Sequence, residues 1–455
     1  MPVASATSQL APINNVSYLE GHLVLRLHLD YRLECFDLIS IRHTGRNILI
    51  IFLIFYFFAI VQIVLALLSL RGGLRFRNYI QLELDRPKTD FKLFASVIVP
   101  CRGLDQGLRE NLATLFELNY PCYELLFVVD AESDPAHAVI SDLCRKCTAL
   151  QVTSRILIAG ASQQNSQKVH NLIHAVNHVD PGSEILVFID SDARPHPGWL
   201  SALTEPLSDV TVGAATGYRW FVPVRGGFTA HLRSVWNASI ASALGANRNG
   251  NFCWGGSTAI RRTTFNTADV EKFWHGAASD DFAMMHALRA ARLPIHFVPS
   301  CLIPSYEDCT LHHLFEFTTR QMKITRVYAE PFWKAVLIGA ALFVPVFFGL
   351  ALLVVTRLLV GGPFLFPLVL FLAIFVLGAV KSAIRLKCVE QIFKINQIPA
   401  SLGFWYQILL WPLGTGLFLL NSLAALFSRR IEWRGIVYQL NSPSETAIIQ
   451  RFSRN

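Results

Sequence analysis

Long apolar stretches constrain this chain more than any other feature of its sequence. There are four of them, at residues 47–70, 333–356, 359–380 and 403–427. A helix needs about 20 predominantly apolar residues to cross the hydrocarbon core of a bilayer. In the last stretch Pro412 and Gly414 interrupt the pattern, which neighbouring helices or water can accommodate. The chain is therefore predicted to be an integral, multi-pass protein in contact with the lipid bilayer.

Composition agrees with a membrane location. Only 16% of the 455 residues are charged and 53% are hydrophobic, whereas soluble domains have about 25% charged residues. Basic flanks beside membrane spans account for the net charge of +8, so we expect no nucleic acid among the partners. Cys144 and Cys147 have no second pair at zinc-finger spacing, and we interpret them as ordinary helix cysteines.

The N-terminal segment, residues 1–46, is mixed and polar. It has no apolar core followed by a small-residue cleavage site, as a secretory signal would have. We expect this segment to be retained and partly disordered.

The positions of Arg and Lys predict the orientation in the membrane. A basic cluster follows the first apolar stretch, and it consists of Arg71, Arg75, Arg77, Arg86, Lys88 and Lys92. Loops rich in these residues stay in the cytoplasm. We therefore expect residues 71–330 to be cytoplasmic, at a bacterial inner membrane or at the endoplasmic reticulum or Golgi of a eukaryote.

The last apolar stretch leaves two alternatives. Three full spans after a cytoplasmic domain place the tail, residues 428–455, outside. The charges of Arg429, Arg430 and Arg434 favour the inside. We expect residues 403–427 to span the membrane, and a re-entrant or interfacial helix is the alternative.

Between the first and second apolar stretches, strand patterns alternate with helix patterns. Five short runs are nearly continuous in Val, Ile, Leu and Phe, at residues 96–100, 125–130, 155–159, 185–190 and 212–217. Strands of a parallel sheet that is covered on both faces have this pattern. The region is therefore predicted to be a layered α/β domain, with its functional residues at the carboxyl ends of the strands.

Two carboxylates follow the fourth predicted strand. Asp190 and Asp192 are two positions apart, so both side chains point to the same side while the chain stays extended. Such a pair can hold a hard divalent cation together with phosphate oxygens. A solvated Asp-Ser-Asp turn is the alternative.

Other polar residues follow the neighbouring strands. Asp130 ends the second strand and could accept hydrogen bonds from a nucleotide or cap the next helix. Pro100 ends the first strand. Lys168 opens a helix-like stretch, where it could meet a phosphate, although a surface lysine is the simpler interpretation.

Two further groups are candidates for chemistry. Asp280 and Asp281 begin a helix-like run. Acidic residues at a helix start interact favourably with the helix dipole in any protein. Adjacent carboxylates could also raise one pKa toward that of a useful general base. Arg320 and Lys323 precede the second apolar stretch, where they could hold a pyrophosphate, bind lipid headgroups or simply flank the span.

The order of these pieces resembles glycosyltransferase family 2-type enzymes. The most similar group is family 21, the ceramide glucosyltransferase group, with its bacterial lipid- and hopanoid-associated relatives. The resemblance covers about residues 45–440. It is carried by the strand at 97–100, the helix and L-x-Y-P turn at 111–121, Asp130, the K-x-x-N-L segment with Lys168 and Asn171, the D-x-D pair, the Gly-rich loop with Trp254, Gly255 and Gly256, and Asp281 preceded by Asp280 in place of the usual Glu.

The resemblance implies a fold and an activity. The fold is GT-A, a Rossmann-like mixed sheet, combined with transmembrane helices. The activity is transfer of a hexose, with inversion, from a UDP-sugar (UDP-glucose favoured) to a lipid such as ceramide, a hopanoid, diacylglycerol or a polyprenyl lipid.

The resemblance also implies roles for single residues. Residues that would bind the nucleotide sugar are Pro100, Asp130, Lys168 and Asp190. Asp190 and Asp192 would hold Mg or Mn, and Asp281, with Asp280 beside it, would be the catalytic base. Trp254, Gly255 and Gly256 would contact the acceptor.

One motif departs from the family. Where the family has Q/R-x-x-R-W, this chain has Arg320 followed by Lys323 and Ile324. Lys keeps the charge without the bidentate fork of Arg, and Ile lacks a flat face for stacking on a sugar. The change argues against a processive polysaccharide synthase, which remains an alternative, as does an inactive membrane-anchored scaffold.

Overall fold

The computed structural model describes residues 16–147 and 152–452, with the backbone alone for residues 16–46 and 48. The chain forms two compact units, Met1–Val61 and Gln62–Asn455.

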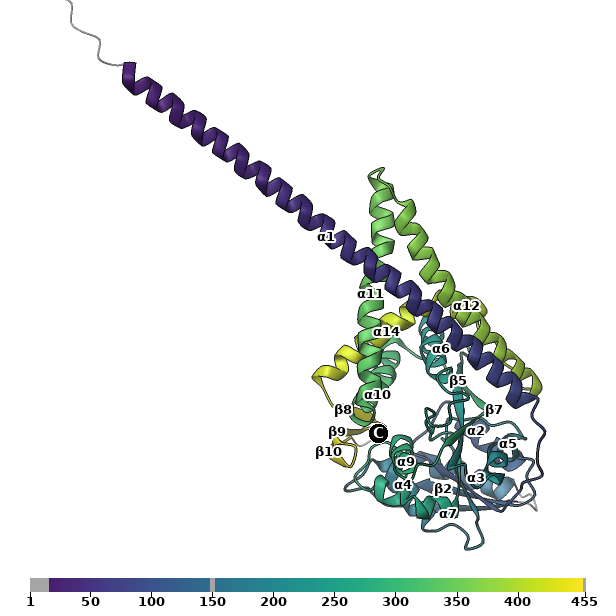
Figure 1. Ribbon diagram of the computed structural model, residues 1–455. Coiled ribbons are helices and arrows are strands. Elements are labelled where there is room, and N and C mark those ends of the chain that lie inside the picture. Colours follow the sequence, from purple (N-terminus) through teal and green to yellow (C-terminus); the bar gives the residue numbers. More distant parts are fainter. Residues whose placement is uncertain (1–15, 148–151, 453–455) are drawn as a thin grey trace, which may run out of the picture. The chain divides into compact units, whose positions relative to one another are not determined.

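Helix α1, Val16–Leu84, is the longest element (Figure 1). It extends well beyond the apolar stretch expected at residues 47–70, and its backbone is helical from residue 16, where we expected a partly disordered segment. No proline interrupts residues 16–84, so nothing in this stretch removes a helical hydrogen bond. From Leu49 to Leu84 the helix is long and apolar enough to cross a membrane.

A seven-stranded sheet forms the centre of the second unit, in the order β3-β2-β1-β4-β6-β5-β7. The five predicted strands are confirmed as β1 Ala95–Pro100, β2 Tyr123–Val129, β3 Val152–Ile158, β4 Ile185–Phe188 and β5 Ala214–Val222. Strands β1 to β4 pair in parallel. Strand β6, Thr258–Arg261, is antiparallel to both β4 and β5, and β7, Ile295–Tyr306, is parallel to β5. The sheet is therefore mixed, as expected.

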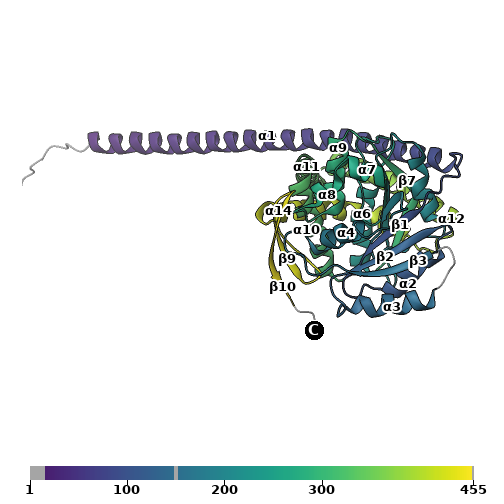
Figure 2. The same ribbon diagram turned by 90° about the horizontal axis from the view of Figure 1, so that it is seen from below.

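Alternate residues of the strands face two separate cores. Val97 and Phe127 pack in one core, with residues of α2, Leu108–Ala113, and α3, Pro135–Lys146. Ile98 and Leu126 pack in the other, with α4, Gln167–Val176, and α9, Asp280–Ala290. Figure 2 shows β1, β2 and β3 side by side, with α3 along them. Burial on both faces explains why β1 and β2 are apolar at most positions.

Shorter elements complete this α/β domain. They are the 3₁₀ helices Thr114–Glu117 and Glu205–Ser208 and the α-helices α5 Trp199–Thr204, α6 Phe228–Ala241, α7 Arg262–Thr267, α8 Val270–Trp274 and α10 Leu311–Tyr328.

Two long apolar helices follow, α11 Glu330–Leu359 and α12 Leu365–Ile395. They lie side by side as an antiparallel pair (Figure 1). Gly361, with φ +67, lies in the turn between them. Together with α1 they are the helices of the described chain that are long and apolar enough to cross a membrane. The expected fold class, an α/β domain with a mixed sheet plus apolar helices of membrane-spanning length, is confirmed.

The last apolar stretch is broken into two short helices. These are α13 Phe404–Leu409 and α14 Trp411–Phe427, and Pro412 lies in the first turn of α14. Proline is favoured there because its missing N–H would have no helical partner. At 17 residues α14 is shorter than the three candidate spans, and residues 403–427 do not form one continuous helix.

The C-terminal tail is a structured part of the second unit. It forms a three-stranded antiparallel sheet from β8 Arg430–Trp433, β9 Ile436–Ser442 and β10 Glu445–Arg451. Strands β8 and β9 pack against α10, and the side chain of Arg434 bonds the carbonyl of Arg102 at the end of β1. The tail is therefore packed against the α/β domain.

Candidate functional site

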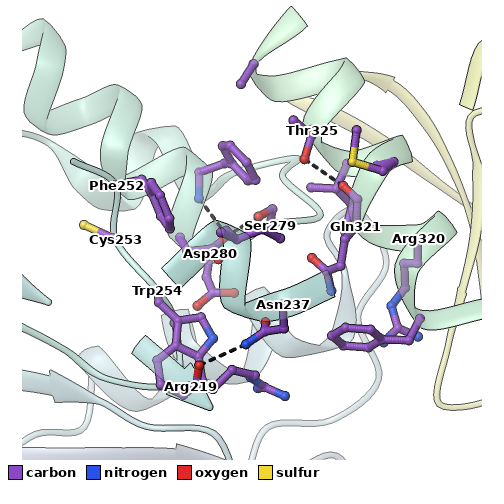
Figure 3. A pocket seen from close by; sticks show the side chains of 18 of the residues that line it. Arg219, Asn237, Phe252, Cys253, Trp254, Ser279, Asp280, Arg320, Gln321 and Thr325 are labelled. Carbon is purple, nitrogen blue, oxygen red and sulfur yellow. Dashed lines mark hydrogen bonds between the residues drawn. The ribbon is translucent and has the colours of Figure 1, made fainter. Parts of the chain in front are cut away.

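A cavity of about 620 Å³ opens at the carboxyl ends of the parallel strands. Figure 3 shows side chains that line it, among them Arg219, Trp254 and Asp280. Pro100, Asp190 and Asp192 line it from the strand ends. Lys168 and Asp280 reach it from α4 and α9, and residues of α6, α10, α11 and α14 complete its wall. The cavity thus joins charged groups at one end to helices that are apolar at the other.

Asp190 and Asp192 share one cation inside the protein. The guanidinium of Arg219, on β5, lies 3.1 Å from a carboxylate oxygen of each. Arg219 is buried and also stacks over the ring of Trp254 at 4.9 Å. Burial by itself would raise the pKa of Asp190, but the charges of Lys168 and Arg219 outweigh it and lower that pKa. Burial and the negative charge of Asp190 raise the pKa of Asp192. The pair is therefore arranged to bind a shared positive charge.

Lys168 connects the D-x-D pair to the start of α9. Its Nζ lies 2.8 Å from Asp190 and 3.0 Å from Asp280, so it is no surface lysine. Ser166 caps α4 just before it. Burial raises the pKa of Asp280 to about 6, with Asp281 and Asp190 adding to the effect and Lys168 opposing it.

Asp281 lies beside Asp280 but in a different environment. It is half-buried, accepts a hydrogen bond from the Ser279 hydroxyl and one from the Phe282 amide at 2.8 Å, and lines the cavity. These bonds hold the carboxylate in one orientation at the first turn of the helix. It can accept a proton from a hydroxyl in the cavity.

The strand-end residues on the other side form a second charged group. Asp130, after β2, pairs with Arg102, and it is Arg102 and Pro100 that line the cavity. Asp134 caps α3 through the amide of Ala136, and it also accepts from the amide of Gly103. Asp130 itself is not among the lining residues, and it contacts the cavity wall through Arg102.

Arg320 and Lys323, the basic pair expected on α10, have different surroundings. Arg320 lines the cavity, where burial lowers its pKa, and the nearby charges of Arg434 and Arg219 lower it further. Lys323 instead donates to the carbonyl of Arg430 at 2.7 Å and is not among the cavity-lining residues. The two basic residues of this motif on α10 therefore do not act at the same place.

The Gly-rich loop is shaped by close packing. A Cβ atom on Gly255 would lie 2.2 Å from a carboxylate oxygen of Asp280, and one on Gly256 would lie 2.2 Å from the ring of Trp254. Trp254 and Gly255 line the cavity. Gly256 lies behind the indole, so its absent side chain serves the packing of Trp254.

The opposite end of the cavity is apolar. Its wall includes Phe332, Val336 and Ala340 of α11 and Thr415 and Phe418 of α14. Helix α11 is one of the candidate membrane spans. A ligand with a polar head and an apolar chain fits both ends of the cavity.

Several basic or aromatic cavity residues were not predicted from the sequence, among them Arg219, Trp433 and Arg434. Arg219 is the charged residue of strand β5, which is buried at every position, and a charge within such an apolar run is the sequence signal that points to it. Trp433 and Arg434 line the cavity from the tail. Nothing local in the sequence places the tail at the strand ends, because the contact joins the C-terminal hairpin to the end of the first strand of the sheet.

Comparison with known proteins places these observations in a family. The model of the family described as glycosyl transferase family 21 matches residues 52–446. Ceramide glucosyltransferase 1 of Caenorhabditis elegans is 28% identical over 193 residues, which are 41% of this chain and 40% of that protein. The aligned region thus spans well under half of the length of this relative.

Solved structures show a more distant likeness. A mannosyltransferase from Pyrobaculum calidifontis, in complex with GDP-Man and Mn²⁺, matches with a TM-score of 0.42 and 16% identity over 81% of this chain and 99% of that one. Glucosyl-3-phosphoglycerate synthase from Mycobacterium tuberculosis, in complex with Mn²⁺ and UDP-glucose, matches with a TM-score of 0.32 and 16% identity over 51% and 78%.

Proposed function

This chain belongs to glycosyl transferase family 21, and on that premise we propose that it transfers a hexose from a UDP-sugar, with UDP-glucose favoured, to a membrane lipid with inversion at the anomeric carbon. The acceptor is a lipid with a free hydroxyl, such as ceramide, a hopanoid, diacylglycerol or a polyprenyl lipid.

One observation carries this proposal. A single cavity extends from Asp190 and Asp192 to Val336 and Phe418 on apolar helices. A soluble sugar acceptor would not need the apolar end. A lipid would, because its chains stay in the hydrocarbon while its hydroxyl reaches the charged end.

The charged end suits a nucleotide diphosphate and a divalent cation. Asp190 and Asp192 would hold Mg or Mn, and they fit such an ion because they already converge on one cation, the guanidinium of Arg219. Within the described residues no group of three or more His, Cys, Asp or Glu side chains could hold a metal by itself. The other ligands would be phosphate oxygens and water, as is usual for Mg. When bound, the ion offsets charge on the leaving diphosphate.

The protein groups have distinct tasks in a direct displacement. The acceptor oxygen bonds to the anomeric carbon while the bond from that carbon to the diphosphate breaks. Asp281 takes the hydroxyl proton. Arg320, a cation in a positively charged part of the cavity, stabilises the departing UDP.

We propose that the α/β domain and the tail are both cytoplasmic. Helices α11 and α12 then cross as a hairpin that returns to the starting side. Helix α14 lies at the interface, and Arg429 and Arg430 remain on the inside, as charge distribution favours.

Membranes containing the protein, given radiolabelled UDP-glucose or UDP-N-acetylglucosamine with Mn²⁺ and then extracted with organic solvent, test the proposal. We expect label in one discrete lipid, and we expect its loss with chelator and in Asp192→Asn. Mass analysis of that lipid identifies the acceptor.

Other outcomes would redirect the assignment. Label confined to solvent-insoluble, high-molecular-weight material would indicate a polysaccharide synthase. No label from either donor, with folded protein and lipid extract present, would contradict the transferase activity.

A further inference from the structure

The tip of the β8–β9 hairpin reaches the charged end of the cavity. Trp433 and Arg434 line the cavity there, together with Tyr438 of β9. The hairpin begins only after the last apolar helix, so a C-terminal segment contributes to a site built mainly by the ends of strands that come much earlier in the chain.

Arg434 has an unfavourable backbone conformation. It has φ +51 and the next residue, Gly435, has φ +75. Both central residues of this two-residue turn are thus left-handed, as in the type I′ hairpins that favour Asn, Asp or Gly at the first position. An arginine at that position costs conformational energy, and such outliers persist where the side chain is needed.

The side chain of Arg434 is linked to the D-x-D loop. Its Nη2 pairs with one carboxylate oxygen of Asp105. The other oxygen of Asp105 accepts the Ser191 hydroxyl at 2.6 Å. Ser191 separates Asp190 from Asp192, so the hairpin tip is connected to the residue between the two carboxylates.

Arg434 is also linked to the other strand-end aspartate. Its Nη1 donates to the carbonyl of Arg102 at 2.7 Å, and Nε of Arg102 donates to the carbonyl of Arg434 at 3.2 Å. Arg102 in turn pairs with Asp130. Arg434 therefore contacts Asp105, which is bonded to the D-x-D loop, and Arg102, which is paired with Asp130.

Other residues of the tail sheet also contact the α/β domain. The hydroxyl oxygen of Tyr438 accepts a hydrogen bond from the backbone N–H of Gln167 at 3.0 Å, next to Lys168 in the chain. Gly276 lies so close to the β9–β10 turn that a Cβ would be 2.0 Å from the carbonyl of Ser444. The hairpin tip is thereby held at the cavity by contacts on two sides.

We propose that Arg434 is a positioning residue of the donor site, which holds the D-x-D loop through Asp105 and the Asp130 group through Arg102, and that the C-terminal sheet is thus part of the active site. The inference rests on the proposed function, because it takes the ligand at these carboxylates to be a nucleoside diphosphate.

The test replaces Arg434 by Asn, which suits the left-handed turn. Asn relieves the left-handed strain but loses the contacts to Asp105 and to the Arg102 carbonyl, so we expect Arg434→Asn to fold with a somewhat lower unfolding temperature than the wild type. We expect the KM for UDP-glucose and the Kd for UDP with Mn²⁺ to rise about 10- to 100-fold, as when residues supporting a metal site are lost. Arg434→Lys, which can contact Asp105 through one nitrogen, should recover part of the affinity.

Two further variants complete the design. Arg430→Gln removes an exposed positive charge from the same sheet and should leave UDP binding unchanged. Asp105→Asn should weaken UDP binding, and the double variant with Arg434→Asn should be less affected than the sum of the two, because both act through one link.

The outcomes separate this inference from the proposed function. Wild-type protein that binds no UDP and transfers no sugar would overturn both. Wild-type activity with an unchanged KM and Kd in Arg434→Asn would overturn the inference alone. An Arg434→Asn protein that fails to fold would assign the residue to folding and also overturn the positioning role.

Discussion

The Nζ atom of Lys168 lies 3.0 Å from a carboxylate oxygen of Asp280. The same ammonium group is 2.8 Å from Asp190. The carboxylate at the start of α9 and the first aspartate of the D-x-D pair are thus joined through one buried lysine. This link makes the donor side of the cavity sensitive to the ionisation of Asp280.

Activity should therefore depend on pH near 6. Burial raises the pKa of Asp280 to about 6, so below that pH the carboxyl is protonated and its ion pair with Lys168 is lost. We expect log kcat/KM to rise with pH up to about 6 and then level off. In Asp280→Asn this rise of log kcat/KM below pH 6 should be absent. A rise that persists in the variant would show that another group causes the pH dependence.

Asp281→Asn tests the base. The amide cannot take the proton of the acceptor hydroxyl, so kcat should fall about 10²- to 10⁴-fold while the Kd for UDP stays the same. Asp269→Asn is the matched control, since Asp269 is exposed and left-handed, where Asn is well tolerated. Loss of UDP affinity in Asp281→Asn would assign the residue to donor binding instead.

Arg219→Gln removes the cation that Asp190 and Asp192 share. Loss of hydrogen bonds to charged groups should lower the stability of the metal-free protein by about 1.5–3 kcal/mol. Mn²⁺ should raise the unfolding temperature of the variant more than that of the wild type, because the ion replaces the missing charge. Arg248→Gln, at a more exposed pair with Asp209, is the control. An equal Mn²⁺ effect in both proteins would contradict metal binding at these carboxylates.

Gly255→Ala should disrupt the site from the Gly-rich loop. The new Cβ would lie 2.2 Å from Asp280 and 2.7 Å from Nζ of Lys168, and neither group can move without losing its partners. We expect a destabilisation of about 1–3 kcal/mol and loss of turnover. Gly245→Ala, where nothing lies within 4 Å of the added carbon, should have neither effect. Normal turnover in Gly255→Ala would show that this packing is not required.

Val336→Phe tests the apolar end of the cavity. The larger ring occupies space on α11 that a lipid chain would use, so the KM for the lipid acceptor should rise about tenfold while UDP binding stays the same. The tenfold value corresponds to about 1.4 kcal/mol, roughly the hydrophobic contribution of two buried methylene groups. Ile338→Phe on the exposed face of the same helix is the control. Equal KM values for the two variants would place the acceptor elsewhere.

Much of the fold could be predicted because its signals are local. Each apolar run that became one of the strands β1 to β5, and the apolar part of each long helix, is readable within its own continuous stretch of sequence. Asp190 and Asp192 were predicted as a pair because a strand leads directly into them. Asp280 and Asp281 were predicted because they begin a helix.

Other features were not readable in this way. Lys323 keeps the charge of its motif, yet it turns to the backbone of Arg430, which depends on where the tail folds. The stretch at residues 403–427 is apolar enough for a span, but Pro412 restarts the helix and leaves α14 with 17 residues. The tail sheet that follows it is bonded to the α/β domain.

The sequence by itself determined the apolar stretches of membrane-spanning length, the α/β domain and the acidic residues at the strand ends, because hydrophobic period and strand-end position are properties of neighbouring residues. Only the tertiary structure decided that Arg219 bridges Asp190 and Asp192, and that Arg434 joins their loop to Arg102. Those contacts connect residues on different elements, and the last of them joins the tail to the first strand of the sheet. Their energy depends on distances that exist only once the sheet, the helices and the tail have packed together.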